Sequence, residues 1–552
     1  GSGRFGKWLE NLNDWNLSRS RYWGTPLPIW RTEDGDEEKC IGSVEELYNE
    51  IEKAVAAGVM KSNPYKDKGF VPGVYTAENY DKIDLHRPYV DDIKLVSDSG
   101  KPMRRELDLI DVWFDSGSMP YAQIHYPFEN KEAFDKREVY PADFIAEGVD
   151  QTRGWFFTLH AIAGMVFDTK AYKSVISNGL VLDKNGNKMS KRLGNAVDPF
   201  DALQTYGADA IRWYFYINSA PWLPNRFHGK AVMEGQRKFM GTLWNTYAFF
   251  VLYANIDNFD ATKYTLEYDK LPVMDKWLLS KLNSTVKAVD DDLANYRIPE
   301  AARALQEFVD DMSNWYVRRS RERFWAKGME QDKINAYMTL YTALVTISKA
   351  AAPMIPFMTE EIYQNLVRSI DKTAPESIHL CDFPTVDEAH IDAELEAKMD
   401  EVLKIVVMGR AARNTANIKN RQPIAKMFVK APEKLPEFYQ EIIEDELNVK
   451  SVEFTDDVRS FTSYTFKPQL KTVGPKYGKQ LGNIKKALTE LDGNAAMDTL
   501  NEKGALTFNF DGNEVVLTKD DLLIDMAQTE GYVSESDGET SVVLDTNLTP
   551  EL

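Results

Sequence analysis

The sequence predicts a multidomain protein in which an α/β region comes first, an α-helical bundle follows, and a small α+β module comes last. Three observations support this prediction. The chain has 552 residues, too many for one hydrophobic core. Between about residues 111 and 220, short apolar strand patterns alternate with helical patterns, which is typical of a parallel sheet covered by helices. From about residue 231 the apolar residues recur three or four positions apart, as on one face of a helix.

These patterns suggest three domains. We expect an α/β domain over residues 1–230, with a polar, turn-rich insertion at about 31–110. A helical domain over 231–428 is indicated by two apolar faces, Leu278-Leu282-Val286-Val289-Leu293 and Leu305-Phe308-Val309-Met312-Trp315. A small α+β module over 429–552 is indicated by a predicted hairpin around Asp511-Gly512 and a predicted strand at 541–544.

Composition limits the classes of function. The net charge of −20 argues against indiscriminate nucleic-acid binding. It still allows a local basic face, because salt screens charges beyond about 8 Å. Residues 409–426 are such a stretch, with five Lys or Arg and no acid. The two cysteines, Cys40 and Cys381, favour a reducing compartment over a disulfide framework and exclude a four-cysteine zinc site. No apolar run is nearly as long as a membrane-spanning helix needs to be, so we expect a cytoplasmic protein without a membrane partner.

The lysine loop, Lys188-Met189-Ser190-Lys191-Arg192, is the first candidate site. It follows an apolar run at 175–182, read here as one strand, and a turn at 183–187 that contains Asn-Gly. Two ammonium groups on a loop beyond a strand end can meet a phosphate chain as point charges. By itself such a pentapeptide is more often an exposed polar turn.

Two further segments carry candidate binding residues. Glu147, Asp150 and Gln151 follow a predicted strand, and in open parallel sheets ligands bind beyond the carboxyl ends of strands. Their carboxylates and amide can hold an ammonium group or ribose hydroxyls; a solvated helix start is the alternative. Trp113, beside Gly and Ser in the segment 111–120, can form an apolar wall for a small side chain, or simply part of the core.

These segments occur together and in order, after Trp15-Asn16-Leu17-Ser18-Arg19-Ser20-Arg21-Tyr22-Trp23-Gly24. The combination resembles the class I aminoacyl-tRNA synthetases specific for branched aliphatic amino acids. It is most similar to the isoleucyl-tRNA synthetases of the eukaryote-like type, especially over 113–123 and 144–156. The segments 313–321 and 421–423 resemble the anticodon-binding region of that family. Alternatives are a valyl or leucyl enzyme, or a non-catalytic tRNA-binding protein that retains the nucleotide fold.

The resemblance implies a role for each candidate residue. Residues 188–192 match the mobile ATP-binding loop, with Lys188 and Lys191 catalytic and Arg192 where many relatives carry Ser. Glu147, Asp150 and Gln151 match the residues that hold the aminoacyl-adenylate, and Trp113 and Trp155 match the walls of the isoleucine pocket. The implied substrates are isoleucine, tRNA(Ile) and ATP with magnesium, with adenylate formation followed by aminoacyl transfer.

The resemblance also implies a fold and a tRNA surface. The α/β region matches the second half of a class I Rossmann-type catalytic domain, and the bundle matches an anticodon-binding domain. Candidate tRNA contacts are Arg319, Arg323, Arg413, Lys419 and Arg421. On spacing alone, a solvated helix surface explains these charges as well.

One family motif is not found in the sequence. None of the six histidines stands in a His-x-Gly-His context, and no editing domain precedes Trp15. We therefore expect a fragment of a larger monomeric enzyme that by itself does not form the adenylate. Some relatives carry a cysteine cluster near Cys40, but this chain has one cysteine there, so no structural zinc is expected.

Overall fold

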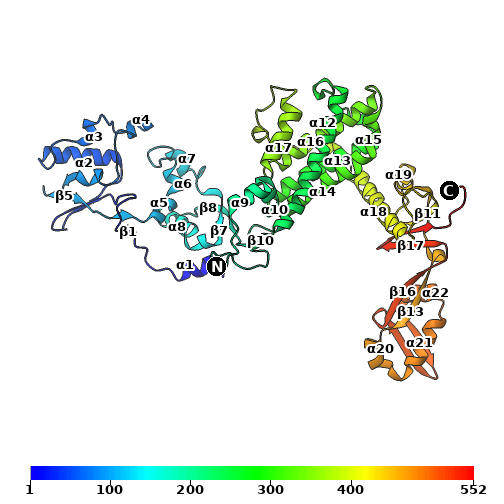
Figure 1. Ribbon diagram of the computed structural model, residues 1–552. Coiled ribbons are helices and arrows are strands. Elements are labelled where there is room, and N and C mark those ends of the chain that lie inside the picture. The colour runs from blue at the N-terminus through cyan, green and yellow to red at the C-terminus, as the bar shows by residue number, and fades with distance from the viewer. Residues whose placement is uncertain (1) are drawn as a thin grey trace. The chain divides into compact units, whose positions relative to one another are not determined.

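The computed structural model describes residues 2–552, in two compact units (Figure 1). Unit 1 runs to Met240 and also includes Asp292–Arg303. Unit 2 comprises Gly241–Asp291 and Ala304–Leu552. The order of an α/β region, a helical region and an α+β region is as predicted, which confirms the fold class. The three-domain division stays a prediction.

Unit 1 is built from short strands and helices. Its elements in chain order are α1 (Arg4–Glu10), β1 (Ser18–Arg19), β2 (Ile29–Thr32), β3 (Glu38–Cys40), α2 (Val44–Ala56), α3 (Pro64–Asp67), α4 (Ala77–Tyr80), β4 (Lys94–Val96), β5 (Pro102–Arg105), β6 (Leu109–Ile110), α5 (Val112–Gly117), α6 (Met119–Ala122), α7 (Lys131–Asp135), β7 (Ala142–Gly148), α8 (Trp155–Ile162), β8 (Tyr172–Asn178), β9 (Val181–Leu182), α9 (Pro199–Tyr206), α10 (Ala208–Asn218), β10 (Asn225–Arg226) and α11 (Gly229–Gly235). The pairs β7–β8 and β9–β10 are parallel.

The predicted insertion forms a four-stranded antiparallel sheet in the order β3-β2-β5-β4. One face of this sheet is buried against α2 and α3, the blue helices of Figure 1. Helix α2 begins where the Ser43 side chain accepts the amide hydrogen of Glu46 at 2.9 Å, which satisfies one of the free amides of its first turn. It buries Leu47 and Ile51 at a helical spacing, so helix and sheet share one core.

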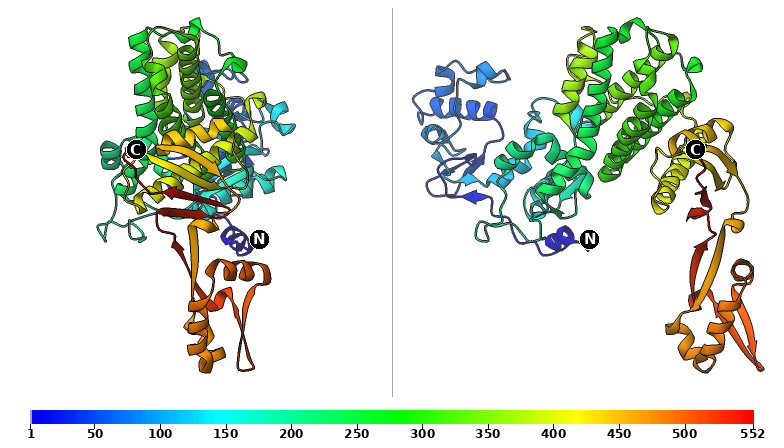
Figure 2. Two further views of the ribbon diagram at one scale, coloured as in Figure 1. Left: turned by 90° about the vertical axis from the view of Figure 1, so that its right-hand side faces the viewer. Right: turned by 45° about the vertical axis from the view of Figure 1, so that its right-hand side comes forward.

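Unit 2 begins as a helix bundle. Its helices are α12 (Thr242–Asp257), α13 (Val273–Ala294), α14 (Ile298–Asp311), α15 (Arg318–Trp325), α16 (Gln331–Ala351), α17 (Pro356–Tyr363) and α18 (Ala393–Thr415). The end of α13 and the start of α14, Asp292–Arg303, group with unit 1. The green helices lie side by side in both views of Figure 2. The two predicted apolar faces are buried with one partial exception, Leu293, which confirms the helical periodicity.

The last part of unit 2 is the α+β region. Its elements are β11 (Ile424–Lys430), α19 (Glu437–Leu447), β12 (Val449–Phe454), β13 (Thr462–Pro468), α20 (Leu470–Tyr477), α21 (Leu481–Glu490), α22 (Gly493–Lys503), β14 (Ala505–Phe510), β15 (Asn513–Thr518), β16 (Leu522–Gln528), β17 (Tyr532–Asp537) and β18 (Thr540–Asp545). A mixed sheet β12-β11-β18-β17 packs on α18, and β14–β15 is the predicted hairpin. No helix among residues 2–552 is both long and apolar enough to cross a membrane.

Candidate active site

The acidic segment lies at the carboxyl end of β7, beside the carboxyl end of the parallel strand β8. In the β7–β8 ladder, Glu147 is opposite Ser177 and Gly148 is opposite Asn178. Strand β7 therefore ends in the acidic segment at the edge where β8 leads toward the lysine loop. This is the edge at which ligands bind in parallel sheets.

The apolar run at 175–182 is not one strand, contrary to the prediction. Strand β8 ends at Asn178, and β9 begins at Val181. The amide of Gly179 donates to Pro221 O at 2.9 Å, and a Cβ at Gly179 would lie 2.3 Å from Leu223 O. The close approach of the 221–223 backbone thus breaks the run, and β9 pairs instead with β10.

Asp183 organises the turn before the lysines. Its Oδ1 accepts the backbone amides of Asn185 at 2.9 Å and Asn187 at 2.8 Å. Gly186, with φ +86°, lets the chain reverse here, as expected for an Asn-Gly turn. Hydrogen bonds from the Asn195 amide and from the backbone of Asn187 hold the pKa of Asp183 below its ordinary value. An Asp two residues before Asn-Gly is a turn signal from which Asp183 could have been predicted.

Asn195 closes the loop from its far end. Its Nδ2 donates to Asp183 Oδ2 at 2.9 Å and to Lys188 O at 3.1 Å. Its Oδ1 accepts the backbone amide of Ser190 at 2.9 Å. One side chain thereby ties the turn, the first lysine and the middle of the loop together. Asn195 was not predicted as a site residue, because no local sequence pattern indicates these contacts.

The two lysines project from this closed loop. Lys188, Lys191 and Arg192 are exposed, whereas Met189 and Ser190 are half-buried. In the part of the chain that the structure describes, none of the three cations forms an ion pair. Their charge is therefore not neutralised by the protein and can act on an incoming anion.

The acidic segment has two exposed carboxylates, Glu147 and Asp150, and the second is hydrogen-bonded to Gln151. Glu147 is exposed, and no ion pair or hydrogen bond of its side chain occurs among the described residues. Gln151 donates through Nε2 to Asp150 Oδ2 at 3.0 Å and accepts the Trp155 amide through Oε1 at 2.9 Å. A Cβ at Gly148 would lie 2.6 Å from Asp150 Oδ1, so glycine allows this carboxylate to approach the strand end.

Trp113 and Trp155 meet at the start of α8. A Cβ at Gly154 would lie 3.1 Å from the Trp113 ring, so the glycine lets that ring lie against the backbone just before Trp155. Trp155 Nε1 donates to Ser116 O at 3.0 Å, which fixes its indole against α5. Trp113 is 42% exposed, so part of its ring remains accessible.

Asp111 joins the Trp113 helix to the early tryptophan segment and was not predicted as a site residue from sequence. It is buried, and its Oδ1 accepts the Trp113 amide at 3.1 Å, which caps α5. Its Oδ2 accepts Trp15 Nε1 at 2.8 Å and Arg19 Nη2 at 2.9 Å. Nearby, burial raises the pKa of Asp115, although Thr25 donates to its carboxylate. The early tryptophan segment and the Trp113 helix therefore form one structure.

The five candidate tRNA contacts fall into two groups, and the first consists of Arg319 and Arg323. Arg323 donates to both oxygens of the fully buried Asp275, at 2.7 and 2.8 Å. Arg319 donates to Glu446 at 2.7 Å and lies over the Trp315 ring. Both guanidinium groups are therefore paired with carboxylates inside unit 2, and the role of Arg319 and Arg323 as tRNA contacts stays a prediction.

Arg413 also has a structural environment, unlike the two cations after it. It is buried, and its guanidinium donates to four carbonyl oxygens, those of Leu447, Lys419, Gln422 and Asn448. A phosphate cannot reach this group in the present conformation. Lys419 and Arg421 are exposed, and neither forms an ion pair among residues 2–552. They remain open to an RNA phosphate.

Comparison with known proteins identifies the family. The family described as tRNA synthetases class I (I, L, M and V) matches residues 1–223. The anticodon-binding domain of tRNA ligase matches residues 275–429. The chain belongs to the class I tRNA synthetases.

Isoleucine–tRNA ligases are similar to this synthetase chain over its whole length. The ligase of Bacteroides fragilis is 55% identical over 557 residues, which cover 100% of this chain and 49% of that protein. The ligase of Clostridium tetani is 51% identical over 553 residues, covering 100% of this chain and 50% of that protein. These relatives confirm the predicted resemblance to the isoleucyl branch over the valyl and leucyl alternatives. The chain spans about half the length of the curated relatives it matches.

Solved structures of other synthetases are more distant. The ternary complex of Agrobacterium radiobacter LeuRS with tRNA and LeuAMS has a TM-score of 0.48 and 17% identity, and the match covers 71% of this chain and 45% of that chain. Mycobacterium tuberculosis methionyl-tRNA synthetase with methionyl-adenylate has a TM-score of 0.40 and 16% identity, and the match covers 62% of this chain and 68% of that chain.

Proposed function

We propose that the complete enzyme to which this chain belongs activates isoleucine with ATP and transfers it to tRNA(Ile). The observation that carries this proposal is the arrangement at one sheet edge. The end of β7 carries an exposed carboxylate, Glu147, and the chain runs from the neighbouring end of β8 through β9 to a closed loop with two unpaired lysines, Lys188 and Lys191. The similarity to isoleucine–tRNA ligases supports the choice of amino acid.

The proposed first step is adenylate formation. A carboxylate oxygen of isoleucine attacks the α-phosphorus of ATP, bound as its magnesium complex, and the bond to the pyrophosphate oxygen breaks. Negative charge grows on the phosphoryl oxygens and on the leaving pyrophosphate. Lys188 and Lys191 stabilise that charge more strongly than the charge of the bound substrate, which lowers the barrier.

Glu147, Asp150 and Gln151 have the complementary task in this proposal. Glu147 and Asp150 bind the α-ammonium group and the ribose hydroxyls of the adenylate, while Trp113 and Trp155 enclose the aliphatic side chain. An apolar wall distinguishes isoleucine from valine by about 1–3 kcal/mol, because the two differ by one methylene.

The remaining assignments are also proposals. We retain a catalytic region at 1–230, a helical tRNA-binding region at 231–428 and a C-terminal module at 429–552. Lys419 and Arg421 are the proposed RNA contacts, because their charges have no partner in the described part of the chain. A monomeric state and a cytoplasmic location complete the proposal.

Isoleucine-dependent exchange of pyrophosphate into ATP tests the proposed activity in the complete protein. Lys191→Ala should lower the exchange rate by about 10²–10³-fold, as for the loss of one group that stabilises transition-state charge. Lys184→Ala is the matched control, because Lys184 is an exposed lysine in the turn just before the Asn195–Lys188 hydrogen bond. It should change the rate little. Equal rates for Lys191→Ala and the unaltered protein, or exchange that depends on valine or leucine instead, would contradict the proposal.

A further inference from the structure

The sheet of the predicted insertion carries cations on neighbouring strands. Arg31 on β2 is opposite Arg104 on β5, and Arg104 is opposite Lys94 on β4. Side chains paired in this way have Cβ atoms about 4.5–5.5 Å apart. Three positive residues therefore follow one another across about 10 Å of sheet.

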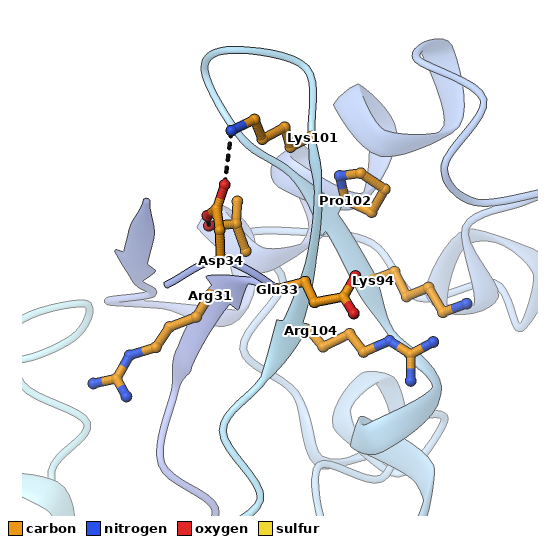
Figure 3. Close-up of a pocket in the computed structure, with 8 residues that line it drawn as sticks. Arg31, Glu33, Asp34, Lys94, Lys101, Pro102 and Arg104 are labelled. Atoms are coloured by element: carbon orange, nitrogen blue, oxygen red, sulfur yellow. Dashed lines mark hydrogen bonds and ion pairs between the residues drawn. The ribbon is translucent and has the colours of Figure 1, made fainter. Parts of the chain in front are cut away.

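These cations lie on the solvent face. Alternate residues of the same strands, Trp30, Met103 and Leu95, are at most 2% exposed and belong to the core against α2. Since successive strand residues point to opposite faces, Arg104 and Lys94 point away from that core. They line a hollow of about 970 Å³ together with Arg31, Thr32, Glu33, Asp34, Lys101 and Pro102 (Figure 3).

Only part of this charge is balanced by the protein. Arg31 pairs with Glu38 at 2.9 Å and with Glu106 at 3.1 Å. Lys101 pairs with Asp34 at 2.8 Å, the dashed contact in Figure 3. Within residues 2–552, Arg104 and Lys94 have no ion-pair partner. Figure 3 shows their side chains extending the same way, whereas Arg31 extends to the other side.

Two adjacent like charges on a rigid sheet are unfavourable unless something else binds them. Arg offers a planar fork for phosphate oxygens and Lys a compact point charge, a combination that suits two phosphates of a nucleic-acid backbone. Lysine is depleted in buried protein interfaces, which disfavours a covering protein surface. We propose that Arg104 and Lys94 bind neighbouring phosphates of an RNA. The choice of RNA rests on the proposed function, because tRNA is its polyanionic substrate.

The salt dependence of RNA binding by this chain tests the proposal. Affinity for deacylated tRNA(Ile) and for an unrelated RNA of equal length is measured by fluorescence anisotropy at several salt concentrations. The double variant Arg104→Gln/Lys94→Gln should lower the slope of log K against log[salt] by about 1.4–1.8, the value for two phosphate contacts. The double variant should weaken the binding of both RNAs equally, because phosphate contacts carry no sequence information.

Two controls make the test specific. Lys61→Gln/Lys68→Gln removes two exposed cations from the segments that pack on the buried side of the same sheet, and should leave the slope unchanged. Glu33→Gln removes a carboxylate from the hollow itself and should strengthen binding. The thermal midpoint of Arg104→Gln/Lys94→Gln should be equal to or above that of the unaltered chain, since a like-charge pair is removed.

Three results would overturn the proposal: no RNA binding by the unaltered chain, equal slopes for the two double variants, or binding of polyglutamate but not RNA through Arg104 and Lys94. Pyrophosphate exchange involves no RNA, so its outcome with Lys191→Ala bears on the proposed function alone. The proposed function and the proposed RNA contacts of Arg104 and Lys94 can therefore fail separately.

Discussion

Replacing Arg323 by Gln separates a structural role of this arginine from a role in RNA binding. Its guanidinium donates to both oxygens of Asp275 and also to Asp332 Oδ2 at 3.1 Å. Asp275 lies on α13 and is fully buried, and its only other side-chain partner among the described residues is the Tyr316 hydroxyl. Burial and the neighbouring Asp275 raise the pKa of Tyr316, which keeps this hydroxyl a donor.

The expected cost of Arg323→Gln follows from these contacts. Removing one partner of a buried ion pair costs about 3–5 kcal/mol, because the other charge is left uncompensated. The Tyr316 hydroxyl keeps one hydrogen bond to Asp275, and the exposed Asp332 contributes no more than about 1 kcal/mol. We therefore expect a loss of about 3–4 kcal/mol. At a typical urea slope of about 1–3 kcal/mol per M, the urea midpoint of unit 2 falls by about 1–4 M.

Urea unfolding of the chain, followed by tryptophan fluorescence, measures this change. Trp315 and Trp325 flank Arg323 in sequence and report on this region. The matched control is the double variant Arg323→Gln/Asp275→Asn, which removes both charges and should recover most of the stability. In conditions where Arg323→Gln is folded, its salt slope for RNA binding should equal that of the unaltered chain.

Two outcomes would refute this reasoning. An unchanged urea midpoint for Arg323→Gln would mean that the buried pair contributes no net stability. A lower salt slope in the folded Arg323→Gln variant would mean that this guanidinium leaves Asp275 and contacts RNA.

Three other changes have expected outcomes. Asn195→Asp removes the amide donor that joins Asp183 and the Lys188 carbonyl, so deuterium uptake by residues 185–195 should rise about tenfold; unchanged uptake would exclude the clamp. Burial raises the pKa of Asp311 to about 7, so the folded chain keeps a proton that the unfolded chain loses above about 3.8, and stability falls as the pH rises through this window. Asp311→Asn should accordingly stabilise unit 2 by about 2–4 kcal/mol at pH 8 and hardly at all at pH 4. Thermal unfolding at both pH values measures this difference. Lys419→Gln/Arg421→Gln should lower the RNA salt slope by about 1.4–1.8 without changing the urea midpoint; an unchanged slope would remove these two residues from the proposed interface.

Local sequence determined several of the helices and strands and the residue types of the candidate site. The three-to-four spacing from Leu278 to Val289 predicts one buried helix face, and the structure buries it, because helix periodicity depends on neighbouring residues alone. The hairpin around Asp511-Gly512 formed as predicted for the same reason, since both residues adopt positive φ angles at little cost. The family resemblance likewise rests on contiguous motifs such as residues 188–192.

Tertiary structure alone decided which charges are available to a ligand. Arg323 and Lys188 are both cations in polar segments, yet Arg323 is held by Asp275, 48 positions away in sequence, while Lys188 has no ion-pair partner among the described residues. The Arg104–Lys94 pair depends on strand register, and the break at Gly179 depends on the backbone at 221–223. Electrostatic and steric effects act through space over a few ångströms, whereas sequence patterns report only on neighbours along the chain.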